Sequence, residues 1–197
     1  MATLAKKLGK QADHGRMPAT GPSTAGAVAI GFGAGLAFAL GRKIAVQAVS
    51  GLAGNWFEAI RTEHRLALMI FDKILETPDD ATAKRTLLLT TLKHALSKHA
   101  FQEENVIYPA LRDAAEAEQA DHLNHDHGYI KTYLYDLDVI PKDQPAWLDK
   151  VRELRQLVAD HAREEEEDIF PPFEKAMSAA ENSKLTLMMN KEGFKLA

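Results

Sequence analysis

Residues 99–109 read HAFQEENVIYP and residues 161–171 read HAREEEEDIFP, so the two stretches, which begin 62 positions apart, share one frame. In each stretch a glutamate stands four positions after the first histidine, and a proline stands ten positions after it. Residues four apart share one face of an α-helix, and a proline relaxes or ends a helix. The frame therefore predicts two helices that each direct a His–Glu pair toward a common neighbour. The pairs are His99 with Glu103 and His161 with Glu165.

These stretches belong to two of four long helical patterns, which are recognised by apolar residues at spacings of three and four. The patterns cover approximately residues 56–76, 81–115, 118–137 and 146–178. The sequence contains no alternating strand pattern of useful length. Short connections make neighbouring helices antiparallel. The predicted fold class is therefore all-α, an antiparallel up-down-up-down four-helix bundle.

The bundle is one of four predicted regions. Residues 1–24 are rich in Gly, Pro, Ser and Thr after a basic start, and we expect a disordered basic leader there. Residues 25–53 form an apolar segment rich in Ala and Gly, and the bundle occupies residues 54–180. Residues 181–197 are expected to form a short C-terminal tail with one or two amphipathic turns, broken by Gly193.

A polar residue interrupts the apolar stripe of every predicted helix. Each stripe contains one histidine, and two stripes add a glutamate one turn later: His64, His99, Glu103, His127, His161 and Glu165. Burying an unpaired carboxylate costs several kcal/mol, so two buried glutamates beside four imidazoles indicate cations between them. Such donors suit a pair of metal ions bridged by carboxylates in the bundle interior. Imidazole with carboxylate fits iron best, with manganese and zinc as alternatives.

A single histidine on an apolar stripe is usually a hydrogen-bonded core residue. Four such histidines, one per helix, together with two matched His–Glu pairs, indicate a metal site instead. The other four histidines lie off the stripes or in the leader and are expected on the surface: His14, His94, His122 and His125. His125 is also an alternative ligand, and Glu166 is an alternative to Glu165. The remaining glutamates of these runs are expected to be solvated: Glu104, Glu164 and Glu167.

Composition restricts the other classes of function. The chain has 197 residues, 46% of them hydrophobic, which is enough for a sizeable core. It contains no cysteine, which excludes disulfides, thiolate metal sites and cysteine nucleophiles. The net charge is −4, and residues 1–53 sum to +5, so the remainder sums to −9. An acidic body argues against nucleic acid as the partner.

The residues that carry the frame also resemble a known family. EHR at 63–65, HAFQEENVIYPAL at 99–111, DHGYI at 126–130 and HAREEEEDIFPPF at 161–173 resemble the hemerythrin-like, or HHE cation-binding, family over about residues 54–180. The resemblance implies an antiparallel four-helix bundle with two oxo-bridged iron ions that bind dioxygen or related small molecules. Carried over by position, it implies the six ligands named above, with Glu103 and Glu165 bridging.

The sequence departs from the oxygen-carrying members of that family. Those members use five histidines, with an H-x-x-x-H pair on the third helix, whereas positions 123 and 131 here are Leu and Lys. One fewer histidine leaves a coordination position for water, for substrate, or for a tyrosine such as Tyr129 or Tyr133. This favours dioxygen, peroxide or nitric oxide chemistry, in an oxidoreductase or a binding protein. Iron sensing or storage, and a structural metal-stabilised bundle in an assembly, are the alternatives.

The apolar segment has competing interpretations. Residues 25–41 carry no charge, but a membrane span needs about 20 strongly apolar residues, and this run is shorter and rich in Ala and Gly. Small residues at every fourth position allow close helix packing. Residues 25–53 are therefore predicted to associate with a membrane or with another copy of the chain, and a signal segment ranks below both. The expected location is the cytoplasm, with membrane association as the alternative.

Overall fold

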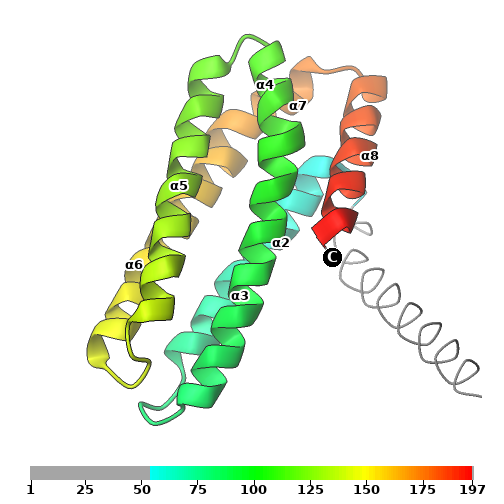
Figure 1. The fold of residues 1–197 in the computed structure, drawn as a ribbon. Helices are drawn as coiled ribbons and strands as arrows, with labels where there is room; N and C mark the ends of the chain where they lie inside the picture. Colours follow the sequence, from blue (N-terminus) through cyan, green and yellow to red (C-terminus); the bar gives the residue numbers. More distant parts are fainter. Residues whose placement is uncertain (1–53, 197) are drawn as a thin grey trace, which may run out of the picture. The chain divides into compact units, whose positions relative to one another are not determined.

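The computed structural model of the protein describes residues 54–196, and their regular structure is helical (Figure 1). Helices α2 and α5 are uninterrupted, whereas two longer rods each consist of an α-helix, a π-helix and a shorter α-helix. The bounds are α2 Trp56–Leu75, α3 Thr82–Gln102, η1 Glu103–Ile107, α4 Tyr108–Asp113, α5 Ala117–Val139, α6 Pro145–Arg163, η2 Glu164–Ile169, α7 Phe170–Ala176 and α8 Ala179–Leu196.

The predicted antiparallel helical bundle is confirmed. Helix α2 packs against α3 and α6, and α5 packs against α4 and α6, so four rods close around one interior. The first rod has a clear start signal, because the Asn55 side chain accepts a 2.8 Å hydrogen bond from the Glu58 N–H. Asn55 thereby satisfies a backbone donor that the first helical turn leaves without an intrahelical partner.

The two prolines of the repeated frame do not end their helices. The Tyr108 N–H bonds to the Glu103 carbonyl, and the Phe170 N–H bonds to the Glu165 carbonyl, five residues back in each case. The following residue in each rod is proline, Pro109 or Pro171, which has no N–H to continue the α-helical ladder. One widened π-helical turn in front of each proline therefore carries the helix past it, and π segments of this kind are common at functional sites.

The bundle interior has a polar layer between two apolar clusters. One cluster is built around Trp56, Phe170 and Leu123, and the other around Phe71, Leu134 and Trp147. On each rod, the histidine of the frame lies between residues of the first cluster and residues of the second. The polar layer is therefore sealed at both ends by side chains that exclude water.

The prediction of a short, broken C-terminal tail is wrong, because α8 is a fifth full helix. Its Leu185, Met189 and Gly193 are buried at a spacing of four, and it packs on α3, η1 and α2. Trp56 anchors it through a 2.8 Å hydrogen bond from the indole Nε1 to Asn182 Oδ1. A glycine inside a helix costs only about 1 kcal/mol relative to alanine, which is less than the stabilisation from burying a leucine and a methionine.

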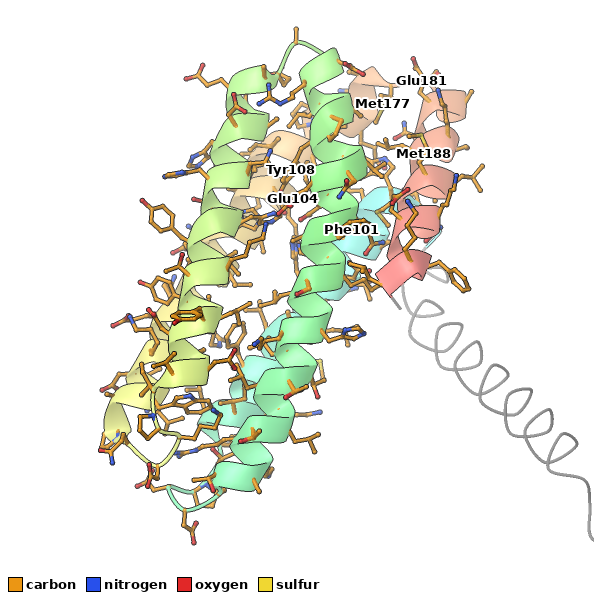
Figure 2. All side chains as sticks on the ribbon, viewed as in Figure 1. Phe101, Glu104, Tyr108, Met177, Glu181 and Met188 are labelled. Atoms are coloured by element: carbon orange, nitrogen blue, oxygen red, sulfur yellow. The ribbon has the colours of Figure 1, made fainter. Side chains whose placement is uncertain are left out.

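Helix α8 leaves a groove where it faces α4 and η1. Met177, Glu181 and Met188 lie along this groove (Figure 2). Within residues 54–196, no helix combines the length and the apolar character that a bilayer crossing requires. The predictions for residues 1–24 and 25–53 concern a part of the chain outside the described residues.

Candidate metal centre

Six buried side chains meet in the polar layer, and they are the six that the sequence predicts. His64 comes from α2, His99 from α3, Glu103 from η1, His127 from α5, His161 from α6 and Glu165 from η2. None is more than 5% exposed. Their ligand atoms form two overlapping groups of four, each with all atoms within 4.8 Å of one another. Both groups contain His99 and Glu103. A carboxylate can bridge two neighbouring metal ions, whereas the one inward nitrogen of an imidazole binds a single ion.

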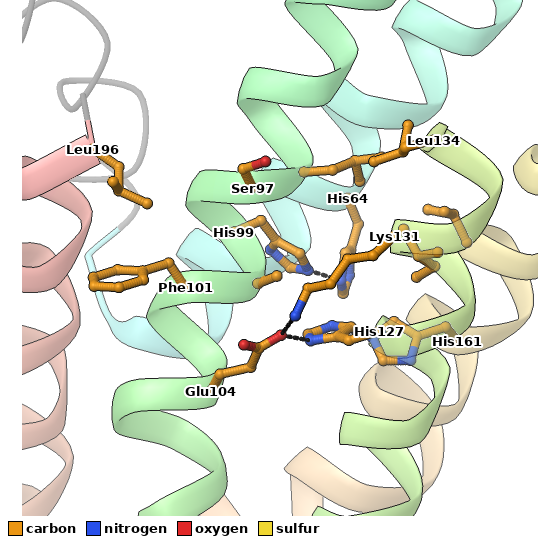
Figure 3. Close-up of a pocket in the computed structure, with 14 residues that line it drawn as sticks. His64, Ser97, His99, Phe101, Glu104, His127, Lys131, Leu134, His161 and Leu196 are labelled. Atoms are coloured by element: carbon orange, nitrogen blue, oxygen red, sulfur yellow. Dashed lines mark hydrogen bonds and ion pairs between the residues drawn. The ribbon is translucent and has the colours of Figure 1, made fainter. Parts of the chain in front are cut away.

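The histidines converge through their Nε2 atoms. His64 Nε2 lies 3.0 Å from His99 Nε2, and His127 Nε2 lies 3.2 Å from His161 Nε2 (Figure 3). Two imidazole nitrogens at this distance can share one proton, or both can face a cation as neutral ligands. A metal ion needs the second state.

Each buried glutamate touches histidines from two different rods. Glu103 Oε2 lies 3.0 Å from His99 Nε2 and 3.3 Å from His127 Nε2. Glu165 reaches His64 Nε2 at 3.3 Å with one oxygen and His161 Nε2 at 3.5 Å with the other. Both carboxylates therefore stand between the two halves of the bundle, where a bridging ligand is required.

Two oxygens in this layer accept no hydrogen bond of good geometry. Glu103 Oε1 and Glu165 Oε2 are buried, and the 3.3 Å contact of Glu165 Oε2 with His64 Nε2 does not satisfy it as a hydrogen bond. An unsatisfied buried acceptor costs roughly 1–3 kcal/mol, and more when it is charged. A cation between the glutamates would satisfy both oxygens, so the residues present fit a pair of metal ions.

A second carboxylate stands behind every histidine of the layer. It faces the Nδ1 atom, and in three of the four pairs a hydrogen bond to Nδ1 fixes the ring so that Nε2 points inward. The pairs are His64 with Glu166 at 2.9 Å, His99 with Glu63 at 3.3 Å, His127 with Glu104 at 3.0 Å and His161 with Asp126 at 3.6 Å. Glu166 is therefore seen behind His64 rather than among the inner six, and Glu104 is not simply solvated.

Three of these outer carboxylates also form an ion pair with a lysine or an arginine. Lys98 Nζ lies 2.6 Å from Glu63, Lys131 Nζ lies 2.6 Å from Glu104, and Arg61 Nε lies 3.3 Å from Glu166. Figure 3 shows one such series of side-chain contacts, from Lys131 to Glu104 and from Glu104 to His127. Each cation holds its carboxylate charged and in place behind the ring.

When no metal is bound, the electrostatics of the layer raise the pKa of His64, His99 and His127 and lower that of Glu103. Burial disfavours the charged form of His127, but hydrogen bonds to Glu103 and Glu104 outweigh it and raise its pKa to about 9. Burial likewise opposes ionisation of Glu103, but the charges and hydrogen bonds of His99 and His127 hold its pKa well below the usual value. A metal ion must therefore displace protons when it binds.

Tyr108 also lies inside the layer, although the apolar stripes do not predict it. Its hydroxyl donates to Glu165 Oε1 at 2.7 Å and lies 3.3 Å from His127 Nε2. Five residues separate it from Glu103, a spacing that turns away on an α-helix but returns to the same face on a π-helix. Burial, followed by the charges of Glu103 and Glu165, raises the pKa of Tyr108 well above its usual value. The proline that follows Tyr108 was the available signal for this widened turn.

The other alternative ligands lie elsewhere. His125 and Tyr129 are exposed on α5, with ring centroids 4.8 Å apart. Tyr133 is half-buried and packs against Lys150. The structure does not bring these three side chains into the polar layer.

A cavity of about 270 Å³ opens beside the imidazoles, between α3 and α5. Its walls are mostly apolar, and Leu96, Ile130 and Leu134 contribute to them. His64, His99, His127 and His161 all border it, and Figure 3 shows them facing it from four helices. Glu104 and Lys131 lie at its edge. A small molecule in this cavity would contact the histidine side of the layer directly.

The bundle is similar to known proteins. The sequence profile of a family described as Hemerythrin HHE cation binding domain matches residues 56–173. A crystal structure of a hemerythrin HHE cation binding domain-containing protein from Mycobacterium kansasii aligns with a TM-score of 0.64 and 26% identity, covering 72% of this chain and 86% of that one. A DNA nickase from Nostoc sp. is 26% identical over 125 residues, which are 64% of this chain. This chain spans only 35% of the length of the nickase.

Proposed function

Because the chain belongs to the hemerythrin HHE cation-binding domain family, we propose that its buried histidines and glutamates hold two iron ions and that this centre binds or processes a small oxidant or gas. The candidates are dioxygen, peroxide and nitric oxide. The observation that carries the proposal is the pair of unsatisfied buried oxygens, Glu103 Oε1 and Glu165 Oε2, among four imidazole Nε2 atoms.

The donors favour iron over other cations. Four imidazoles with two carboxylates make a mixed nitrogen and oxygen set, which suits iron, with manganese and zinc as alternatives. When bound, an iron pair supplies redox chemistry toward small oxygen and nitrogen species. The chain's own contribution is to hold the rings through the outer carboxylates and to exclude water with the two apolar clusters.

Tyr108 would serve as a hydrogen-bond donor at the centre. Its raised pKa keeps the phenol protonated, and its hydroxyl already donates to Glu165 at 2.7 Å. A molecule that approaches the layer and gains negative charge could receive this hydrogen bond in place of Glu165.

The cavity favours a small, uncharged substrate. Its apolar walls offer little to a strongly hydrated ion, whereas dioxygen, nitric oxide and hydrogen peroxide are neutral. Hydrogen peroxide is chemically self-sufficient, because two molecules disproportionate to dioxygen and two waters without another reductant.

Other functions receive less support from this chain. The nickase activity of the Nostoc relative belongs to a protein of which this chain spans 35%, and residues 54–197 carry a net charge of −9, which opposes binding to DNA. An iron-sensing role would use the same six ligands without turnover. Turnover of a substrate by the iron-loaded protein would distinguish catalysis from sensing.

The metal hypothesis is tested on protein purified in air. We expect about two irons per chain and a near-ultraviolet absorption that disappears in His99→Ala. His94→Ala is the matched control, because His94 is exposed on the same helix and should keep all the metal. Protein that contains only zinc, or that keeps its iron in His99→Ala, would contradict the proposal.

The substrate hypothesis is tested by mixing iron-loaded protein with hydrogen peroxide and following dioxygen release. Release well above that of free iron, and its loss in His127→Ala, would identify peroxide as the substrate. If no dioxygen forms, spectral titration of the reduced protein with dioxygen and with nitric oxide distinguishes gas binding from iron sensing. A sensor should bind neither gas while still binding iron.

A further inference from the structure

The polar layer is built from two similar halves, one on α2 and α3 and the other on α5 and α6. The second half lacks a lysine that the first half has. Glu63 precedes His64 along α2 and stands behind His99, and Asp126 precedes His127 along α5 and stands behind His161. In the first half Lys98, itself 6% exposed, holds Glu63 at 2.6 Å. In the second half the residue that corresponds to Lys98 is Asp160, which cannot supply a positive charge.

Asp126 is consequently the exception among the four outer carboxylates. The other three each pair with a lysine or an arginine, whereas within residues 54–196 the contact of Asp126 on its outer side is the imidazole of His122, 4.0 Å away. His161, the histidine that faces Asp126, is also the least firmly positioned of the four. Its Nδ1 atom is buried and makes no hydrogen bond. The distance from this nitrogen to Asp126 Oδ2 is 3.6 Å.

The outer side of Asp126 already has the donors of a metal site. His122 and Asp126 are one helical turn apart on α5, and Glu164 approaches from η2, with its Oε2 atom 3.2 Å from His122 Nε2. One ligand atom from each of these residues lies within 4.8 Å of the others. The side chains of His122 and Glu164 are 52% and 37% exposed, and that of Asp126 is 17% exposed.

We propose that His122, Asp126 and Glu164 bind a divalent transition-metal ion at the surface of the bundle, separate from the buried layer. One imidazole and two carboxylates suit Zn²⁺, Fe²⁺ or Mn²⁺. The ion supplies the positive charge that Lys98 supplies in the other half. Asp126, whose Oδ2 is the atom nearest to both His122 and His161, then joins the surface ion to His161.

The three residues differ from a chance surface ion pair in one respect. A contact between His122 and Glu164 alone would leave Asp126 free to turn to solvent. Asp126 instead lies between the buried His161 Nδ1 and the exposed His122. A metal-ligating carboxylate that is in turn held by a neighbouring side chain is a common arrangement in metal proteins.

The test uses the full chain as purified, with its resident metal counted beforehand, and the probe is Zn²⁺ followed by titration calorimetry. We expect one additional Zn²⁺ per chain, bound at least tenfold more weakly by His122→Ala and by Glu164→Gln. His125→Ala is the matched control, because His125 is an exposed histidine on the same helix as His122. This variant should bind Zn²⁺ as the unmodified protein does. Asp126 is left intact because it also contacts His161.

The outcomes are distinct. Zinc-edge X-ray absorption of the complex should report one imidazole with carboxylate oxygens, and this signal should be absent in His122→Ala. No additional Zn²⁺, or equal binding by the unmodified protein, His122→Ala and Glu164→Gln, would overturn the proposal. The iron count and the helical signal of each variant, both expected to be unchanged, show that the surface site and the buried layer are being measured separately.

Discussion

The Tyr108 hydroxyl donates a 2.7 Å hydrogen bond to Glu165 Oε1 and so joins the two copies of the repeated frame across the bundle. The second copy cannot return this bond, because the residue at the corresponding position is Phe170. The polar layer is therefore nearly symmetric in its six inner side chains but has its only hydroxyl, among the residues described here, on one side. A single substitution at Tyr108 therefore removes this hydroxyl from the layer and tests its role.

Tyr108→Phe is expected to preserve the fold and the metal content while lowering turnover. The lost hydrogen bond should cost about 1 kcal/mol of unfolding free energy, and loss of a positioned hydrogen-bond donor should lower the rate roughly 10²-fold. Steady-state kinetics of the iron-loaded variant measure this. Tyr129→Phe is the control, since Tyr129 is 50% exposed on α5. Equal losses in both variants would show that Tyr108 has no special role.

Glu166→Gln should weaken metal binding without removing it. The amide cannot hold the His64 ring as the carboxylate does at 2.9 Å, and such outer partners are typically worth 10- to 100-fold in metal affinity. Competition with a chelator gives the affinity. Glu167→Gln, two positions after Glu165 and exposed, should behave like the unmodified chain. Unchanged affinity in Glu166→Gln would argue that packing alone orients His64.

As the pH rises, the metal-free fold should lose stability while metal binding becomes stronger. In the metal-free protein the pKa of His127 is about 9, raised from 6.5, because its bonds to Glu103 and Glu104 outweigh burial. A raised pKa stabilises the fold below pH 6.5, and this contribution, on the order of 3 kcal/mol at most, is lost as the pH rises through 9. Metal binding releases protons, so it should strengthen over the same range.

Thermal unfolding with and without iron checks this prediction. The metal-free melting temperature should fall between pH 6.5 and 9, while the increase caused by iron should grow. A metal-free melting temperature that rises over this range would mean that the layer does not hold the protons inferred for it. At low pH the depressed pKa of Glu103 acts in the other sense, because its stabilisation is lost as the pH falls below 4.5.

Helix α8 should contribute measurably to stability. Met189 is fully buried against the bundle, whereas its neighbour Met188 is 44% exposed. Met189→Ala is therefore expected to cost about 2–4 kcal/mol, and Met188→Ala about 0.5 kcal/mol or less. Denaturant titration of the two variants gives the difference. Similar small costs would mean that α8 docks without stabilising the bundle.

A chain that begins at Gly54 is expected to remain helical and to keep its metal. The four rods and α8 already enclose the polar layer with residues from Trp56 onward. Circular dichroism and metal analysis test this directly. We further predict that the full chain associates with membranes or with itself through residues 25–53, and sedimentation with vesicles and size measurement distinguish the two. If the shortened chain unfolds, part of residues 1–53 belongs to the folded domain.

Local periodicity was enough to predict most of this protein. Apolar stripes located the helices, and one histidine per stripe with two glutamates one turn later located the buried layer, because residues at a spacing of four stay together on any α-helix. His64, His99 and Glu103 are examples, and all three lie where the stripes place them. Each of these inferences needed only the residues of one helix.

Three features depended on contacts that no single helix contains. Tyr108 enters the layer because a π-helical turn changes the local spacing, and an α-helical pattern excludes it. Glu63 and Asp126 stand behind histidines of other rods, so only the packing of the rods makes them partners. Helix α8 forms through Gly193 because the bundle buries Leu185 and Met189. The sequence alone determined which histidines and glutamates turn inward, and the tertiary structure decided which side chains meet them, because packing free energy outweighs local helix preference where the two disagree.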